Sequence, residues 1–332
     1  MLRAAVIGTG SIVRFFLESI HQHPRVQAQA VWTRNSEHAA GLADDFQIPE
    51  ILTSWEALKH HADIDVVYIA SPNSLHAGQA VDLLAHGKHV LIEKPIASNA
   101  KEAAAVQQAA RRYKKIAAEA VTTLYTPGFN ALKEAVSRES WNLVQANFSQ
   151  YSSRYDQLKA GSTPNVFSPD FSGGVLMDLQ IYHLHLFHAL FGPPAEISYH
   201  ASLTQEGIDT SGLLTMRYPD KTISAAAAKD VDTEDFIQFQ GEGVSLRVPH
   251  GVNAGLEAFM DKRGQTRSIV QGPLQERLMD GELDTFCRWI EEGNLEAADR
   301  SLSHSVEVMS SADSARAAAG IHFPADRHPR LP

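Results

Sequence analysis

The sequence contains very little cysteine: one residue, Cys287, in 332. A single cysteine cannot form an intramolecular disulfide, and such usage is typical of a reducing compartment, so we expect a cytoplasmic protein. Cys287 lies within a helical pattern of apolar residues, which favours core packing over a role as a nucleophile.

Long hydrophobic runs and excess positive charge are also missing. No apolar stretch approaches about 18 residues, and no charged-then-apolar leader precedes the first strand, so neither a membrane span nor a signal peptide is predicted. The net charge is −10 and the pI is about 5.9, which argues against nucleic acid or an anionic membrane as the main partner. A hydrophobic content of 44% over this length allows two domains with sizeable cores.

The chain begins with a pattern of strand, glycine turn and helix. Residues 2–7 are apolar, two glycines follow, and an amphipathic helix comes next. This context is typical of a dinucleotide-binding fold, in which the glycines admit the pyrophosphate and the helix amides face its charge, although an ordinary turn has the same pattern. We expect cofactor contacts from Gly8, Gly10, Ser11 and Ile12. Val13 occupies the position where the motif usually has its third glycine. Its larger side chain predicts looser packing between the first strand and the helix, or a helix that lies slightly away from the sheet.

The second strand, residues 26–33, ends without an acidic residue. Folds specific for NAD usually place a carboxylate there to bind the ribose 2′-hydroxyl. Thr33 and Arg34 occupy the position here, and arginine suits a 2′-phosphate, so NADP(H) is favoured, with NAD(H) as the second candidate. A solvated surface arginine is the alternative interpretation.

Two later strands end in polar residues. Residues 65–70 lead into Ser71, Pro72, Asn73 and His76, and residues 90–93 end in Glu93, Lys94 and Pro95. A lysine at the carboxyl end of a buried parallel strand is costly without a task, and open α/β sheets bind ligands at that edge. The alternatives are a lysine that snorkels to solvent and polar residues that cap and fill a helix start.

A further candidate segment, residues 171–185, contains a glycine pair that would let the backbone approach a ligand. Asp178, Tyr182 and His185 follow at helical spacings of four and three, so we expect them on one face, as a proton-handling cluster. A packed tyrosine and a hydrogen-bonded aspartate in an amphipathic helix would look the same. Of His183, His185 and His188 only the last two share a face, and no cysteine is nearby, so no metal is expected.

These motifs, in this order and spacing, resemble the Gfo/Idh/MocA family, which includes glucose–fructose oxidoreductase and inositol dehydrogenase. The resemblance covers nearly the whole chain. It rests on Gly8-x-Gly10, Ser71-Pro72-Asn73-x-x-His76 and Glu93-Lys94-Pro95, and on Glu119-Ala120 with Tyr125 and Pro127 at the crossover into a second domain.

The alternation of strands and helices up to about residue 121 indicates a doubly wound parallel sheet, and the later extended segments indicate an antiparallel one. Those segments are residues 142–151, 195–203, 212–218, 222–229, 236–241 and 244–248, with helices from about 130, 174, 281 and 300. The expected fold class is therefore α/β. Residues 1–122 would form a Rossmann domain, and residues 123–332 an α+β domain with a large, mostly antiparallel, open-faced sheet.

The resemblance implies an NAD(P)-dependent oxidoreductase that transfers hydride between nicotinamide and an alcohol or ketone carbon of a sugar, polyol or similar molecule. Lys94 would polarise the reacting oxygen, Tyr182 would pass the proton, and Asp178 would orient the substrate. The implied cofactor contacts are Thr33, Arg34, Ser71, Pro72, Asn73, His76, Glu93 and Lys94, with a cis Lys94–Pro95 bond.

Two departures from the family pattern affect substrate specificity. Gln180 stands where glycine is usual, and His185 where aspartate or asparagine is common. Both are weaker substrate-binding candidates, as is Arg154 in the polar stretch 151–155. The resemblance also implies a homodimer or homotetramer through the second sheet. The rival functions are a non-catalytic dinucleotide sensor and an enzyme that recycles its cofactor within one turnover, for net hydrolysis or epimerisation.

Overall fold

The computed structural model describes residues 1–252, 256–270, 277 and 279–331. The chain forms two compact units. The first contains Met1–Ala120, residues 279–306 and the C-terminal residues from Pro329, and the second contains the chain between these segments. The expected C-terminal domain, residues 123–332, therefore contributes segments to both units.

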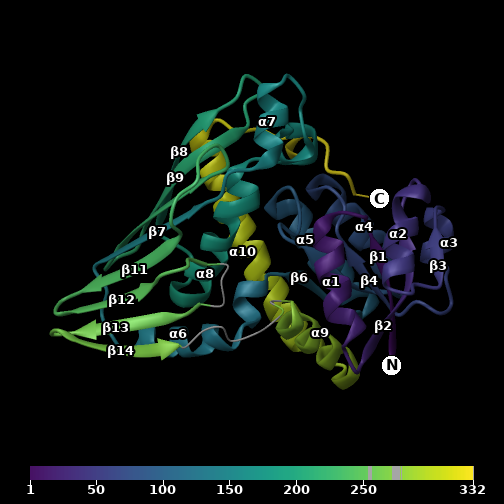
Figure 1. Ribbon diagram of the computed structural model, residues 1–332, viewed down its shortest axis with the longest axis horizontal. Coiled ribbons are helices and arrows are strands. Elements are labelled where there is room, and N and C mark those ends of the chain that lie inside the picture. Colours follow the sequence, from purple (N-terminus) through teal and green to yellow (C-terminus); the bar gives the residue numbers. More distant parts are fainter. Residues whose placement is uncertain (253–255, 271–276, 278, 332) are drawn as a thin grey trace. The chain divides into compact units, whose positions relative to one another are not determined.

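The first unit contains a six-stranded parallel sheet in the order β3-β2-β1-β4-β5-β6. Figure 1 labels five of these strands, all except β5. The strands are β1 (Leu2–Ile7), β2 (Val26–Trp32), β3 (Glu50–Leu52), β4 (Val66–Ile69), β5 (His89–Glu93) and β6 (Ala117–Ala120). This order confirms the doubly wound sheet, whose direction of winding reverses between β1 and β4. β3 was not expected, because a three-residue strand is too short to show a period-2 pattern.

The helices of this unit are α1 (Ser11–His21), α2 (Glu37–Asp45), α3 (Trp55–Lys59), α4 (Asn73–Ala85), α5 (Ala100–Tyr113) and α9 (Asp280–Glu292). One core joins α1, α2 and α9 to the sheet and buries Val13 and Cys287. Val13 is 0% exposed, so a valine at the third-glycine position is accommodated as a core residue. Burial raises the pKa of the Cys287 thiol to about 12, which confirms its packing role.

The second unit contains an eight-stranded sheet in the order β14-β13-β12-β11-β7-β10-β9-β8. The strands are β7 (Leu143–Ser149), β8 (Glu196–Leu203), β9 (Asp209–Arg217), β10 (Thr222–Ala228), β11 (Phe236–Gly241), β12 (Val244–Val248), β13 (Ala258–Lys262) and β14 (Gln265–Val270). Among the strand pairs described in this sheet, β7 and β10 are parallel and the others are antiparallel, which confirms the mostly antiparallel prediction. The sequence did not predict β13 and β14. In β14 four successive residues are exposed, so it lacks apolar alternation.

The second unit also contains α6 (Pro127–Ser137), α7 (Ser153–Lys159), α8 (Ile181–Phe191) and short 3₁₀ turns at Thr122–Tyr125, Asn165–Phe167, Pro169–Phe171 and Pro324–Asp326. A π-helical turn, Leu176–Gln180, runs directly into α8 and packs against β7, β9 and β10. α10 (Leu295–Ala319) belongs to the first unit up to Val306 and to the second from Glu307.

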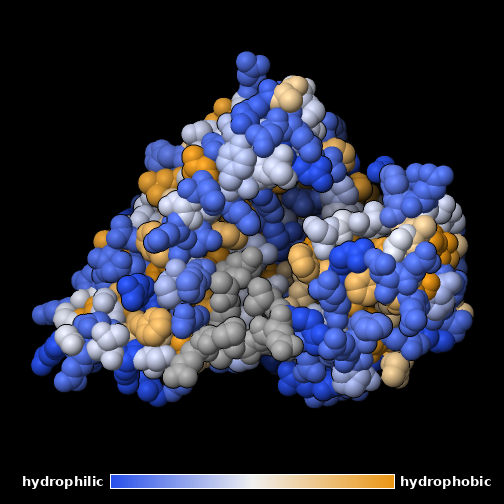
Figure 2. All heavy atoms as spheres, viewed as in Figure 1, coloured by the Kyte–Doolittle hydropathy of each residue, from blue (hydrophilic) through white to orange (hydrophobic). Residues whose placement is uncertain are grey.

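Hydrophilic side chains predominate on the face of the molecule drawn in Figure 2. In the part of the chain that the structure describes, no helix combines the length and the apolar character that a membrane crossing requires.

Candidate active site

The glycine turn after β1 is built around the end of β4. Gly8 has a φ of +110°, and a Cβ placed on it would lie 2.8 Å from the carbonyl oxygen of Ala70. The turn therefore requires glycine for the close approach of two strand ends at the switch point. Gly10 differs, because a Cβ there would meet no atom within 4 Å. Glycine at this position leaves open space above the first turn of α1.

The start of α1 offers unsatisfied donors to that space. Gly10 is the N-cap residue and has no side chain to cap the helix, and its carbonyl oxygen accepts from Val13 and Arg14. Within the described part of the chain, the amides of Ser11 and Ile12 have no acceptor. Two free amides at a helix N-terminus, beside open space, fit a diphosphate group.

The end of β2 presents a buried threonine and an exposed arginine. Thr33 is 8% exposed, and its hydroxyl donates to the carbonyl oxygen of Asn35 at 3.2 Å. The Arg34 side chain is exposed and has no ion-pair partner among the described residues. Thr33 therefore shapes the turn, and the Arg34 guanidinium is available to an anion.

His76 links the loops that follow β4 and β5. Its ring nitrogens lie 2.7 Å from the carbonyl oxygen of Ser71 and 2.9 Å from that of Pro95. Burial lowers the pKa of this histidine, and the two carbonyl oxygens oppose that shift. Pro72 is the N-cap of α4, so Asn73 is the first helical residue and not the cap. The Ser71 hydroxyl donates to Gln79 at 2.6 Å.

Lys94 follows directly on a buried carboxylate at the end of β5. Glu93 accepts from the Tyr68 hydroxyl and, at 3.2 Å, from the Lys94 amide. Burial raises the pKa of Glu93, and the Tyr68 hydrogen bond works against that rise. Lys94 itself is half-buried, and its bond to Pro95 is cis, as the resemblance implied.

The glycine pair of the second unit accommodates the protein's own groups. A Cβ on Gly173 would lie 2.5 Å from the carbonyl oxygen of Val166, and one on Gly174, whose φ is +104°, would lie 2.0 Å from Oδ1 of Asp209. The sequence predicted that these glycines let the backbone approach a ligand, but the structure explains them by packing within the protein. They let a carbonyl and a carboxylate pack against the start of the π-helical turn.

Asp209 is a buried residue that sequence reasoning missed. Its Oδ2 accepts from the Leu176 amide at 2.6 Å and from the Tyr199 hydroxyl at 2.7 Å. Burial raises the pKa of this carboxyl group. Gly212 leaves room for the tyrosine, since a Cβ there would lie 2.2 Å from its hydroxyl oxygen. This network fixes the π-helical turn to β8 and β9.

Asp178 and Tyr182 are both partly exposed, on the π-helical turn and on α8. The Lys229 ammonium, at the end of β10, forms an ion pair with Asp178. The Tyr182 ring meets Phe148 edge to face, with centroids 5.9 Å apart. The helical spacing predicted that His185 lies on the same face as Asp178 and Tyr182. His185 is 0% exposed, however, whereas the other two residues are partly exposed. These residues lie in the second unit and Lys94 lies in the first.

Sequence reasoning also missed Lys229. The signal was present, because Lys229 ends the apolar strand segment 222–228 in the way that Lys94 ends its own strand. The partner, Asp178, is 51 residues away in sequence. Only the fold shows that the two meet.

The weaker candidates have structural partners. Gln180 is fully buried, donates to the Ala225 carbonyl oxygen and lies against the His183 ring, which leaves its expected substrate contact without support. Arg154 is exposed on α7, within 3.5 Å of Gln157, so part of the polar stretch 151–155 belongs to a short helix.

The histidines of α8 are buried. His188 lies 3.0 Å from the Ser311 hydroxyl, and burial lowers the pKa of His183 to about 3 and of His188 to about 4. Among the residues described, no group of three or more His, Cys, Asp or Glu side chains could hold a metal ion.

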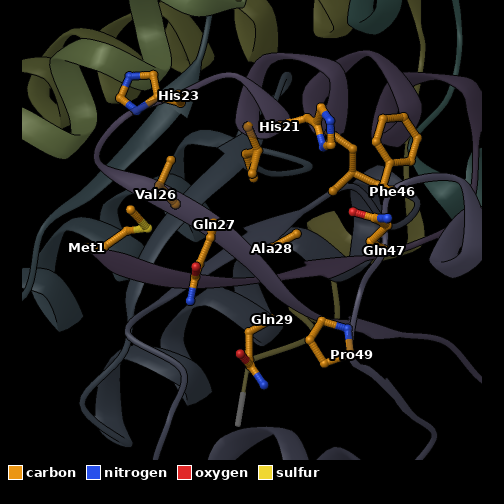
Figure 3. A pocket seen from close by; sticks show the side chains of 12 residues that line it. Met1, His21, His23, Val26, Gln27, Ala28, Gln29, Phe46, Gln47 and Pro49 are labelled. Atoms are coloured by element: carbon orange, nitrogen blue, oxygen red, sulfur yellow. The ribbon is translucent and has the colours of Figure 1, made fainter.

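A separate hollow of about 350 Å³ lies on the first unit (Figure 3). It is lined by Val26, Gln27, Ala28 and Gln29, by the last turn of α1 and by residues around Phe46. Because those β2 residues form the amino half of the strand, the hollow lies away from the carboxyl edge, where Gly8 and Thr33 emerge. It is not the cofactor edge.

Comparison with known proteins identifies the family. Residues 2–121 match the profile described as "Oxidoreductase family, NAD-binding Rossmann fold", and residues 141–267 match the GFO/IDH/MocA C-terminal domain. The Escherichia coli protein "Uncharacterized oxidoreductase YgjR" is 35% identical, over 98% of this chain and 99% of its own. The Bacillus subtilis scyllo-inositol 2-dehydrogenase (NADP(+)) IolU is 32% identical, over 98% and 100%.

A solved structure shows the same fold. KijD10, a 3-ketoreductase from Actinomadura kijaniata, in complex with NADP and TDP-benzene, superimposes with a TM-score of 0.82 at 19% identity, over 97% of this chain and 99% of that one. Both family profiles, the full-length relatives and the predicted motifs agree. The chain belongs to the Gfo/Idh/MocA family of oxidoreductases, with an NAD-binding Rossmann domain.

Proposed function

We propose that this protein is an NADP(H)-dependent oxidoreductase that interconverts a secondary alcohol and a ketone on a sugar, a polyol or a similar small molecule. The observation that carries the proposal is the place of Lys94. Ile7, Ile69 and Ile92 are register partners across β1, β4 and β5. Lys94 therefore emerges at the same sheet edge as the open space above Gly10.

The mechanism assigns a task to each of three side chains. When bound, the nicotinamide supplies or accepts the hydride. The Lys94 ammonium donates a hydrogen bond to the reacting oxygen and stabilises its negative charge. In reduction the Tyr182 hydroxyl gives its proton to that oxygen, and in oxidation the Tyr182 phenolate takes the proton. The Asp178 carboxylate accepts from a substrate hydroxyl and orients it.

The cofactor would be held by the first unit. Ser11 and Ile12 would donate their free amides to the diphosphate, and Arg34 would bind the 2′-phosphate of NADP(H). Asn73 and Glu93 would hold the nicotinamide ribose. The name of the Bacillus relative, which specifies NADP(+) and scyllo-inositol, supports this choice of cofactor and of substrate class.

The first experiment measures the rise in melting temperature with saturating NADPH, NADP, NADH and NAD. A ligand that binds only the folded state raises it by mass action, and we expect a larger rise with the phosphorylated forms. Arg34→Ala should weaken NADPH binding about 10- to 100-fold, since hydrogen bonds between charged groups contribute about 1.5–3 kcal/mol. Arg112→Ala, an exposed arginine at the end of α5, is the control. No rise with any of the four dinucleotides would contradict the proposal.

Net turnover of the cofactor separates this proposal from its rivals. A dehydrogenase accumulates NADPH from NADP and scyllo-inositol or a related polyol, whereas a sensor or a cofactor-recycling enzyme does not. The half-buried Lys94 and the ion-paired Asp178 favour the enzyme, because a sensor needs neither.

We also propose that the outer face of the eight-stranded sheet joins subunits into a homodimer or homotetramer. Ser224 of β10 is in register with Thr215 of β9 and Gln145 of β7, which gives the middle of this face uncharged side chains. Leu213 of β9 is 44% exposed, whereas the neighbouring Leu214 is fully buried. An exposed leucine beside uncharged side chains in the middle of an open sheet face favours association.

A further inference from the structure

Lys229 is a buried lysine whose position is set by the sheet. Its side chain is 10% exposed, and its ammonium pairs with Oδ2 of Asp178, whose side chain is 28% exposed. The Lys229 amide donates to the Thr210 carbonyl oxygen at 2.8 Å, and its own carbonyl oxygen accepts from Ser152 at 3.0 Å. Because both backbone groups of Lys229 are hydrogen-bonded, its side chain extends toward Asp178 from a fixed position at the end of β10.

The cost of burial explains why the pair must act together. An ammonium removed from water is stable only beside a negative charge. An aspartate next to that ammonium is favoured in its ionised form. Asp178 is therefore held as a carboxylate, a hydrogen-bond acceptor, at the position where the proposed function needs one.

Other titratable groups lie on the elements that continue the π-helical turn or pack against it. They include Tyr182 and His185 of α8, Asp209 and Arg217 of β9, and Asp230 after β10. Asp209 is bonded to Tyr199 and to the Leu176 amide, and Asp230 accepts from the Thr210 hydroxyl at 2.7 Å. β7, the third strand packed against the turn, has no charged residue. The Lys229 ammonium is the cation whose ion pair with Asp178 anchors the carboxylate to the end of β10.

We propose that Lys229 is a positioning residue for catalysis: it keeps Asp178 ionised and fixes the orientation of its carboxylate toward a substrate hydroxyl. The inference rests on the proposed role of Asp178 in substrate binding. It also specifies the substrate class further, because an ionised acceptor selects a neutral hydroxyl donor at that position over a carboxylate.

The test measures the ionisation of Asp178 directly. Full-length protein labelled with ¹³C at the aspartate carboxyl carbons is titrated by NMR, and the Asp178 signal is identified by its loss in Asp178→Asn. In Lys229→Met the midpoint of Asp178 should rise by about one pH unit or more, the size of effect that a neighbouring charge exerts. Lys221→Met is the matched control, because Lys221 is also 10% exposed and ion-paired, with Asp220. An unchanged midpoint in Lys229→Met would overturn the proposal.

Two further variants keep a polar side chain at position 229, so that the effect of charge is separated from a general loss of structure. Lys229→Gln retains a polar side chain without the charge and should shift the midpoint like Lys229→Met, whereas Lys229→Arg should keep it near the wild-type value. If the titration midpoint of Asp178 rose in Lys229→Met but stayed at the wild-type value in Lys229→Gln, hydrogen bonding and not charge would set it, and the inference would be contradicted.

Activity with NADP and scyllo-inositol provides a second readout. The acid limb of kcat/KM should move to higher pH in Lys229→Gln and stay in place in Lys221→Met. If wild-type protein does not oxidise this polyol, the proposed substrate is wrong, while the NMR titration still decides the role of Lys229.

Discussion

Lys94 is the residue on which the proposed chemistry depends most. Its replacement by alanine removes the hydrogen-bond donor to the reacting oxygen, and we expect kcat to fall by at least about 100-fold, the usual contribution of such a group. NADPH should still raise the melting temperature, because the contacts proposed for the diphosphate lie at Gly10 and the start of α1.

Lys101→Ala is the control for this change, since Lys101 is exposed on α5 and follows Lys94 by seven residues. Its kcat should match that of the wild type. A Lys94→Ala protein that loses NADPH binding and turnover to the same extent would show that Lys94 holds the cofactor and has no separate catalytic task.

His188 should make the protein sensitive to acid. Burial, with a further contribution from His185, lowers its pKa to about 4 in the folded protein, whereas an unfolded histidine titrates near 6.5. As the pH falls below 6.5, protons bind the unfolded chain first, so stability decreases until the folded pKa is reached. The loss from this residue is about 3 kcal/mol between pH 6.5 and 4, at about 1.4 kcal/mol per unit.

Urea unfolding at several pH values checks this expectation. His188→Gln cannot titrate, so its stability should fall less steeply over that range than that of the wild type. His200→Gln, at an exposed position on β8, should retain the wild-type slope. Equal slopes in His188→Gln and the wild type would contradict the prediction.

The sequence revealed single residues where a local pattern was broken. Lys94 was found because a charge follows an apolar strand, and its cis proline followed from the motif. Asp209 and Gln180 could not be assigned, because their partners lie at Leu176, Tyr199 and Ala225, which become neighbours only in the folded sheet. Polar residues that serve the core look like site residues until their hydrogen bonds are known.

At the scale of elements, the π-helical turn depends on a glycine. Gly174→Ala would force a Cβ to within 2.0 Å of the Asp209 carboxylate at a φ of +104°. We expect a loss of about 1–3 kcal/mol from the backbone strain alone and more from the overlap, together with displacement of Asp178.

Gly192→Ala separates these two effects. Gly192 follows α8 with a φ of +75°, but a Cβ there would meet nothing within 4 Å, so only the strain should appear. Urea midpoints should place Gly174→Ala well below Gly192→Ala, and removing the carboxylate in Asp209→Ala should narrow the difference. Equal midpoints for the two glycine variants would show that the overlap relaxes at no cost.

Regular elements were predictable because their periodicity is local. The strands β1, β2, β4 and β5 of the parallel sheet were expected, and so were β7 to β12 in the second sheet. The π-helical turn was not, because its extra residue leaves no mark on an apolar pattern and arises from packing against β7, β9 and β10. The π-helical turn changes the orientation of Asp178 relative to His185, and a prediction based on regular α-helical spacing does not include this change.

For the whole molecule, the sequence predicted two domains but not the path between them. The chain leaves the first unit after Ala120, returns near Met279 and crosses again within α10. The core residues of α9, including Phe286 and Cys287, pack beside α1, about 270 residues earlier in the chain. An apolar helix face shows that a partner exists, but periodicity cannot show which sheet provides it.

The proposed assembly makes a final prediction at this scale. Leu213→Arg places a charge in the middle of the outer sheet face, and a charge buried without a partner at an interface costs several kcal/mol. Sedimentation velocity should show a smaller species than the wild type. Leu295→Arg is matched to it, since Leu295 is 41% exposed against 44% for Leu213 but lies at the start of α10 in the first unit. It should sediment like the wild type. If Leu213→Arg also sediments like the wild type, the subunits meet elsewhere or the chain is a monomer, and the outer sheet face is not the interface.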